Sequence, residues 1–120
     1  MWRLTGCKVV RLSPERHDEI FAHVSHLPHI AAFSLVNSLL ERDKSFFDYL
    51  GGGLKDFSRI AESSADMWVD IFISNKEQVL DAVGNYKKSL NDIEKCISEG
   101  DRKTLKKILE AVNSIRKSSV

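Results

Sequence analysis

The feature that most constrains the fold is a run of apolar residues near the start of the chain. The run contains Ile20, Phe21, Val24, Leu27, Ile30, Ala31, Leu35 and Leu39. This spacing is typical of an α-helix. Phe33, Val36 and Leu40 add apolar side chains on the remaining faces, and a helix that is apolar nearly all round is normally buried on every side. We therefore expect this helix to be covered either by later helices or by the same helix of a second subunit.

Signals for helix ends divide the rest of the chain into helices. Ser13 can cap a helix that starts at Pro14, and Pro28 inside the apolar run predicts a kink. The triplet Gly51-Gly52-Gly53 interrupts the pattern. After a connection with a short helical turn at 43–49, helices are expected at about residues 54–61, 64–74 and 75–99, and a last one after Gly100, capped by Asp101.

Residues 7–12 have the composition of a short β-strand. No other segment of the chain suggests a partner for it, and a lone strand leaves its backbone groups without hydrogen bonds. We therefore expect its partners to lie outside this sequence or on another chain. The expected organisation is a remnant of another domain at 1–13 and one helical domain at 14–120.

Composition excludes several classes of protein. The chain has 120 residues, enough for one domain but too few for a nucleotide-binding domain plus a substrate domain. Eighteen basic residues against 17 acidic ones give a net charge of +1, so no strong attraction to nucleic acid or an acidic membrane is expected. No apolar run approaches the ~20 residues of a membrane span. Cys7 and Cys96 fit no disulfide or metal pattern, which favours a reducing, cytoplasmic setting.

Three histidines recur at every third position, His23, His26 and His29, and admit three interpretations. Histidines on one helix face can bind zinc, although the kink at Pro28 would disturb a regular three-histidine face. His26 could instead form a hydrogen bond to a substrate oxygen. The third interpretation is a structural histidine bonded to backbone groups, and the residues alone favour it.

The glycine triplet precedes a helix, and such a turn can bind an anion through backbone amides and the helix dipole. A plain turn is the alternative, and the triplet is not a Gly-x-Gly-x-x-Gly dinucleotide motif. On the following helix, Arg59 could grip a carboxylate with two hydrogen bonds and Asp56 could orient it. Taken alone, an arginine at such a position is usually a solvated surface residue. Trp68 is expected in the core, where its indole N–H needs a partner, and less as a stacking platform.

Three segments of the chain together resemble the C-terminal helical domain of the prephenate dehydrogenases, a family that includes arogenate dehydrogenases. They are Ser25-His26-Leu27-Pro28-His29, residues 51–61 (GGGLKDFSRIA) and residues 67–76 (MWVDIFISNK). The resemblance extends over about residues 2–100. It implies an all-α helical bundle that forms a homodimer, similar to the C-terminal domain of 6-phosphogluconate dehydrogenase. The segment before Ser13 would then be the last strand of a missing Rossmann domain.

The resemblance also implies an activity and a set of site residues. Enzymes of this family oxidatively decarboxylate prephenate to 4-hydroxyphenylpyruvate in tyrosine biosynthesis and pass a hydride to NAD or NADP; others act on arogenate. By resemblance, His26 would contact the substrate and Arg59 would bind a carboxylate. Gly52 and Asp56 would shape that pocket, and Trp68 would support it.

The chain departs from the family pattern in one large respect. It lacks the Gly-x-Gly-x-x-Gly segment and the catalytic histidine and serine that the family places in the nucleotide-binding domain. We therefore expect no catalytic, cofactor-binding or metal-binding residue within this chain and no activity from the chain alone. Two other functions stay open: a helical self-association module whose motifs are inherited, and a histidine-dependent metal-binding protein.

Overall fold

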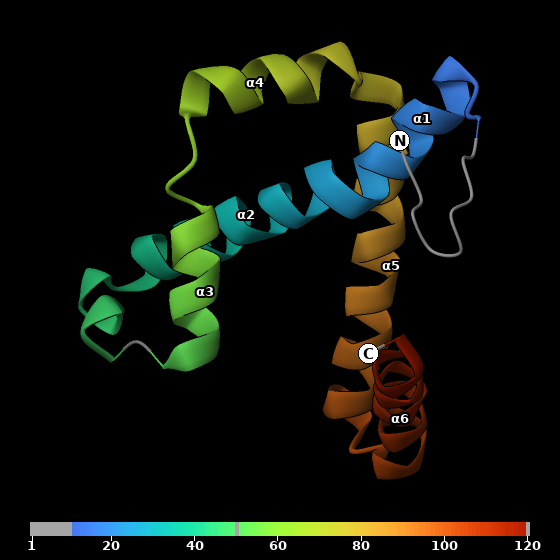
Figure 1. The fold of residues 1–120 in the computed structure, drawn as a ribbon. Coiled ribbons are helices and arrows are strands. Elements are labelled where there is room, and N and C mark those ends of the chain that lie inside the picture. The colour runs from blue at the N-terminus through green and yellow to red at the C-terminus, as the bar shows by residue number, and fades with distance from the viewer. Residues whose placement is uncertain (1–10, 50, 120) are drawn as a thin grey trace. The chain divides into compact units, whose positions relative to one another are not determined.

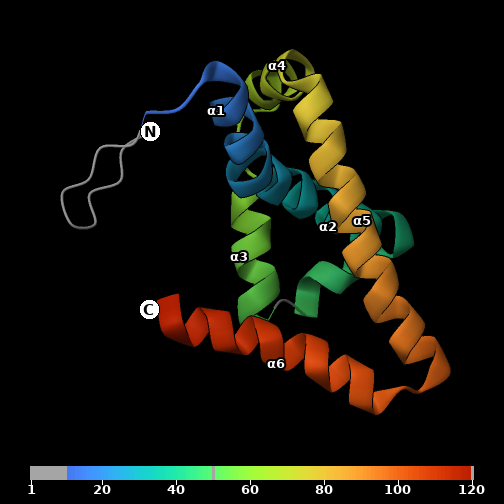
Figure 2. The same cartoon turned by 90° about the vertical axis from the view of Figure 1, so that its right-hand side faces the viewer.

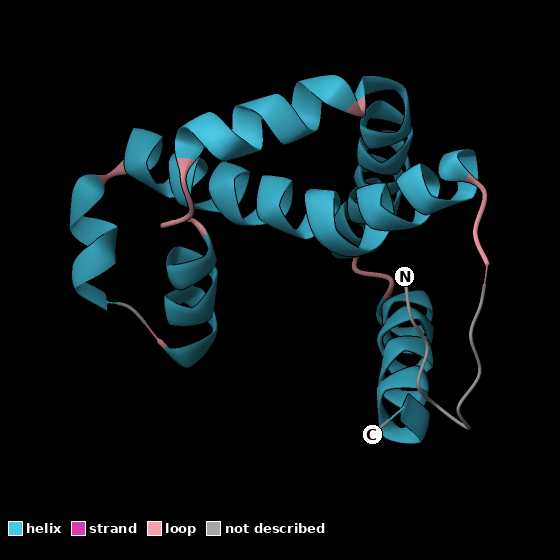
Figure 3. Ribbon diagram, turned by 45° about the horizontal axis from the view of Figure 1, so that its top comes forward, coloured by secondary structure: helices cyan, strands magenta, loops and turns pink. Residues whose placement is uncertain are grey.

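The described part of the chain is helical throughout. A computed structural model describes residues 11–49 and 51–119, and no strand occurs within these ranges (Figure 3). The prediction of an all-α fold is confirmed. The elements are α1 (Pro14–Phe21), the π-helical segment η2 (Ala22–His26), α2 (Leu27–Arg42), the 3-10 segment η3 (Lys44–Tyr49), α3 (Gly52–Ile60), α4 (Ala65–Ser74), α5 (Lys76–Glu99) and α6 (Arg102–Ser119).

Contacts divide the chain into two compact units, Met1–Ala82 and Val83–Val120, with the boundary inside α5. In the first unit, α1, η2 and α2 follow one another along one helical path, and α3 packs against α2 (Figure 1). η3 contacts α2 as well. α2 is therefore the element around which the first unit is arranged.

Local capping explains where several helices begin. The hydroxyls of Ser13 and Ser64 accept hydrogen bonds from the backbone N–H three residues later, at 3.1 and 3.3 Å. The Asp101 carboxylate does the same at 3.0 Å. Gly100, which ends α5, has φ of 64°, a conformation that favours glycine. All four predicted helix boundaries are confirmed.

Two predicted boundaries take a different form. α3 begins at Gly52, because Gly51 is extended and acts as the N-cap, so two of the three glycines lie inside the helix. The kink expected at Pro28 appears as the π segment just before it, where the N–H of Leu27 bonds to the carbonyl of Ala22. A π segment inserts an extra residue into the helical turn. Proline has no backbone N–H to donate, and the wider turn before Pro28 lets the helix continue past it.

The strand expected at residues 7–12 falls mostly on residues 7–10, outside the described residues. The other two residues, Arg11 and Leu12, lie in a loop before α1.

Among residues 11–49 and 51–82, the buried side chains are few and mostly small. They are Ala22, Ala32, Trp68, Val79 and Ala82. Leu35 and Leu40 of α2 stay 37% and 43% exposed, although their helix is apolar nearly all round. The first unit therefore does not cover α2 on every side, which leaves a second subunit as the other predicted way of covering it.

The second unit consists of the C-terminal part of α5 together with α6, and the two helices diverge from the turn between them (Figure 2). Cys96 is buried there and lines a small hollow together with Thr104 and Ile108. Among the helices that the structure describes, none combines the length and apolar character of a membrane span.

Candidate functional site

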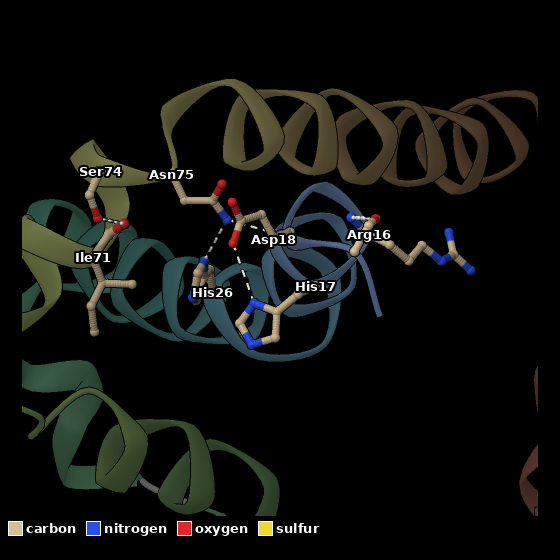
Figure 4. A network of polar contacts seen from close by, with 8 residues as sticks. Arg16, His17, Asp18, His26, Ile71, Ser74 and Asn75 are labelled. Atoms are coloured by element: carbon tan, nitrogen blue, oxygen red, sulfur yellow. Dashed lines mark hydrogen bonds and ion pairs between the residues drawn. The ribbon is translucent and has the colours of Figure 1, made fainter. Parts of the chain in front are cut away.

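His26 occupies the last position of η2, where its side chain is half-buried. Asn75, which joins α4 to α5, approaches it from a distant part of the sequence. The Nδ2 atom of Asn75 lies 3.4 Å from Nδ1 of His26 and donates a hydrogen bond of 3.0 Å to the backbone oxygen of Asp18. Figure 4 shows the Asn75 amide directed at both. α1, η2 and the junction of α4 with α5 therefore meet at His26.

Trp68 of α4 forms the aromatic side of the same cluster. Its side chain is 7% exposed, stacks on His29 with ring centroids 3.7 Å apart, and meets His26 edge-on at 6.1 Å. Phe72 lies against its other side at 5.5 Å. Within the described residues, the buried Nε1 of Trp68 has no hydrogen-bond partner. The expectation that Trp68 belongs to the core agrees with its burial, but its N–H lacks the partner that burial requires.

The electrostatic surroundings of His26 favour its neutral form. Burial is the largest effect and lowers the pKa of His26 below its ordinary value of 6.5. The carboxylate of Asp18 acts in the opposite direction, while the nearby His29 and His17 add to the lowering of the pKa. A neutral imidazole has one nitrogen that donates and one that accepts, so its tautomer decides what it offers a ligand.

The other two histidines of the run are bonded to the backbone. Nδ1 of His23 lies 2.8 Å from the carbonyl oxygen of Glu19, and Nδ1 of His29 lies 3.0 Å from that of Ser25. In the described residues, no three or more His, Cys, Asp or Glu side chains form a group that could hold a metal ion. The geometry at His23 and His29 is that of structural histidines.

Arg59, Asp56 and Gly52 lie on α3, away from this cluster. The guanidinium of Arg59 and the carboxylate of Asp56 form an ion pair at 3.3 Å, and their side chains are 74% and 69% exposed. Gly52 opens the helix, and a Cβ atom there would meet nothing within 4 Å. The guanidinium therefore has one carboxylate beside it and is otherwise open to solvent, where it could donate hydrogen bonds to a second carboxylate.

The structure thus brings the predicted residues together in two groups. His26 and Trp68 are in contact, and Arg59, Asp56 and Gly52 share α3. Across residues 11–49 and 51–119, no hydrogen bond, ion pair or ring contact joins the two groups.

Three contributors were missed as parts of the site. His29 had a usable signal, because it lies one helical turn after His26. Asp18 and Asn75 had none, since Asn75 contacts His26 across 49 positions and Asp18 across 57. For Asn75 the sequence predicted only a local role, as the first residue of the helix expected at about residues 75–99.

A groove of about 540 Å³ lies between α2 and α4. Its lining includes Ile30, Phe33 and Asn37 from α2 and Trp68, Val69 and Phe72 from α4. The other lining side chains are Ser34 from α2 and Ala65 from α4, so the groove is apolar apart from Ser34, Asn37 and the ring nitrogen of Trp68, which is itself buried. The first unit therefore leaves a largely apolar surface between these two helices.

Comparison with known proteins identifies the family of this chain. The family described as the prephenate dehydrogenase dimerization domain matches residues 13–111. The chain belongs to the prephenate dehydrogenase family. The resemblance stated for residues 25–29, 51–61 and 67–76 is confirmed by this match.

Relatives with curated descriptions carry the same family name. The chain is 31% identical over 115 residues to prephenate dehydrogenase of Bacillus subtilis strain 168, covering 93% of this chain and 31% of that protein. It is 32% identical over 114 residues to prephenate dehydrogenase of Lactococcus lactis subsp. cremoris strain MG1363, covering 92% and 32%. The chain therefore spans about a third of the length of these relatives.

Solved structures agree on the fold. A crystal structure of prephenate dehydrogenase from A. aeolicus in complex with hydroxyphenyl propionate and NAD+ matches with a TM-score of 0.87 and 42% identity. That match covers 95% of this chain and 41% of the other. Synechocystis arogenate dehydrogenase, at 23% identity and a TM-score of 0.84, shares the fold, covering 96% and 43%.

Proposed function

We propose that this chain supplies the substrate-binding and dimer-forming part of a prephenate dehydrogenase. The complete enzyme would oxidatively decarboxylate prephenate to 4-hydroxyphenylpyruvate with NAD or NADP, and arogenate is the alternative substrate. The observation that carries the proposal is the Arg59–Asp56 pair on α3, which presents an exposed guanidinium in a chain of this family. Gly52 at the start of the same helix is proposed, from the family resemblance, to help shape the pocket.

The part of these residues in the reaction is binding and orientation. Arg59 holds a carboxylate of the dianionic substrate, and His26 contributes a hydrogen bond, with Trp68 supporting its ring. NAD or NADP, when bound by the complete enzyme, would supply the hydride acceptor for a reaction in which the ring carboxylate leaves as carbon dioxide. Aromatisation of the ring supplies the driving force.

The test is thermal unfolding of the chain with and without prephenate. Prephenate is expected to raise the unfolding temperature of the unchanged chain, because a ligand that binds only the folded state stabilises it. Arg59→Ala should abolish this shift. Its own effect on stability should be small, since an exposed ion pair contributes only about 0–1 kcal/mol.

Arg16→Ala is the matched control for this experiment. Arg16 forms an ion pair of the same spacing with Glu19, at 2.8 Å, and is 60% exposed. This variant loses an equivalent surface pair but keeps Arg59, so the response to prephenate should persist. An unchanged response in Arg59→Ala would contradict the proposed role of Arg59.

We further propose that the chain forms a homodimer and that a second copy covers the groove between α2 and α4. Two observations support this. The matching family is a dimerization domain, and the groove is mostly apolar. Covering apolar surface removes it from water, which favours association.

The competing function is a helical self-association module without ligand chemistry. An assay for NADH or NADPH formation from prephenate separates the two, using this chain alone and mixed with a nucleotide-binding domain of the same family. We expect activity only in the mixture, because the hydride acceptor binds in the Rossmann domain. Dimers without activity or prephenate response, with both parts folded, would favour the module.

The setting of this enzyme is proposed to be the cytoplasm. Cys96 supports this, because it is a buried free thiol. The assignment of residues 1–13 as the remnant last strand of a Rossmann domain stays a proposal.

A further inference from the structure

Asn75 makes two contacts that link distant parts of the first unit. Its Nδ2 lies 3.0 Å from the backbone oxygen of Asp18 and 3.4 Å from Nδ1 of His26. Figure 4 shows the amide between these two neighbours. Both contacts use the same nitrogen, which carries two hydrogens.

The contact with Asp18 fixes the direction of both bonds. A backbone carbonyl only accepts, so the atom of Asn75 that faces it must be the amide nitrogen. The second hydrogen of that nitrogen is left for Nδ1 of His26, which must then accept. An accepting Nδ1 carries no proton, and a neutral His26 therefore carries its proton on Nε2.

The neighbouring histidines have the opposite arrangement. Nδ1 of His23 and Nδ1 of His29 each lie within 3.0 Å of a backbone carbonyl oxygen, so they must donate. Their neutral forms carry the proton on Nδ1 and leave Nε2 as an acceptor. Of the three histidines in the run, His26 alone carries the proton on Nε2 in its neutral form. The cause is Asn75, which donates to Nδ1 of His26.

We propose that Asn75 is a positioning residue that holds His26 as the Nε2–H tautomer, so that His26 offers a hydrogen-bond donor to an oxygen of the substrate. The use of that donor rests on the function proposed above, whereas the tautomer itself does not. The carboxylate and keto oxygens of prephenate only accept hydrogen bonds, so a His26 with a bare Nε2 would repel these oxygens rather than bind them.

The tautomer is measured in the chain without ligand, from two-bond correlations between ring protons and ring nitrogens in a ¹⁵N-labelled sample. The unchanged chain should show the Nε2–H form at His26 and the Nδ1–H form at His23 and His29. An Nδ1–H form at His26 would overturn the proposal without any variant being made.

Asn75→Asp tests the cause, because its carboxylate has the same shape but no donor. The proton of neutral His26 should move to Nδ1, facing the new carboxylate, and the pKa of His26 should rise. Asp18 and His17 on α1 and His29 on α2 also face His26, and they stay unchanged in the variant. Asn91→Asp, an exposed position on α5, makes the same chemical change elsewhere and should leave the spectrum of His26 as it was. An unaltered His26 in Asn75→Asp would overturn the proposal.

Prephenate affinity tests the consequence. At about pH 8, Asn75→Asp should weaken binding about tenfold, the effect expected for losing a hydrogen bond to a charged group. Acidification should restore binding, since the imidazolium carries a proton on both nitrogens. If Asn75 only stabilised the fold, lowering the pH would not restore prephenate binding in Asn75→Asp.

The outcomes separate this inference from the proposed function. Absence of prephenate binding by the unchanged chain would contradict the proposed function but leave the tautomer result standing. Binding by the unchanged chain and by Asn75→Asp with equal affinity at about pH 8 would overturn the positioning role alone.

Discussion

His26 couples the stability of the first unit to pH. Burial lowers its pKa in the folded chain below 6.5, the ordinary value that the unfolded chain retains. Between the folded pKa and 6.5 the unfolded state binds more protons, so the free energy of unfolding rises with pH in that window. The stability that neutral His26 contributes is complete above pH 6.5 and is lost as the pH falls through the folded pKa.

His26→Gln should therefore flatten the pH dependence of stability below pH 6.5, because glutamine does not titrate. The measurement is urea unfolding of both proteins over this range at one fixed protein concentration, since association also changes apparent stability. Above the window the difference between the two proteins should no longer vary with pH. Parallel curves throughout would show that His26 titrates alike in both states.

The sequence predicts the burial or the role of some single residues and not of others. Trp68 was expected in the core because a large aromatic side chain in an apolar helix is normally buried, and it is 7% exposed. For His26 and Arg59 the residues alone left a substrate contact as one of several alternatives, and the family resemblance favoured it. The contact of Asn75 with His26 could not be predicted, because it joins residues 49 positions apart and depends on how α4 and α5 meet.

At the scale of elements, the turn between α5 and α6 depends on one glycine. Gly100 has φ of 64°, and a side chain in this region costs about 1–2 kcal/mol. Gly100→Ala should lower the free energy of unfolding by about that amount, as measured by urea unfolding.

Gly84→Ala is the matched control, because Gly84 also belongs to the second unit but lies inside α5. A Cβ atom there meets nothing within 4 Å, and alanine favours a helix over glycine by about 1 kcal/mol. The two substitutions should thus change stability in opposite directions. The same sign for both would contradict the backbone conformation at Gly100.

Helix boundaries were predictable where a local signal decides them. Ser13, Ser64 and Asp101 each cap through a contact three residues long, and such contacts are encoded by neighbouring residues. The start of α3 at Gly52 was missed because glycine normally breaks helices, whereas here Gly51 already serves as the N-cap. The π segment before Pro28 was expected only as a kink of unspecified form.

At the scale of the whole molecule, the apolar helix predicted a partner but not the surface that receives it. The surface comes from α4, which lies across the groove from α2 and contributes Trp68, Val69 and Phe72. No periodicity in the sequence specifies that these two helices share a groove, because their pairing depends on the loops and on α3 between them. The groove therefore had to be read from the structure.

Val69→Asp tests whether a second copy fills this groove. Val69 is 57% exposed in the single chain, so the folded monomer should tolerate a carboxylate with a change of about 0.5 kcal/mol or less. In a dimer that buries the groove, the same unpaired charge would cost about 3–5 kcal/mol. The dimer dissociation constant should then rise by more than about a hundredfold.

Sedimentation velocity over a range of protein concentrations measures this change, with circular dichroism to show that the variant stays helical. Ser38→Asp is the control, since Ser38 is exposed on the same α2 helix but does not line the groove. We expect a dimer for Ser38→Asp and a folded monomer for Val69→Asp at concentrations where the unchanged chain is dimeric. A Val69→Asp protein that dimerises as tightly as the unchanged chain would place the interface on another surface.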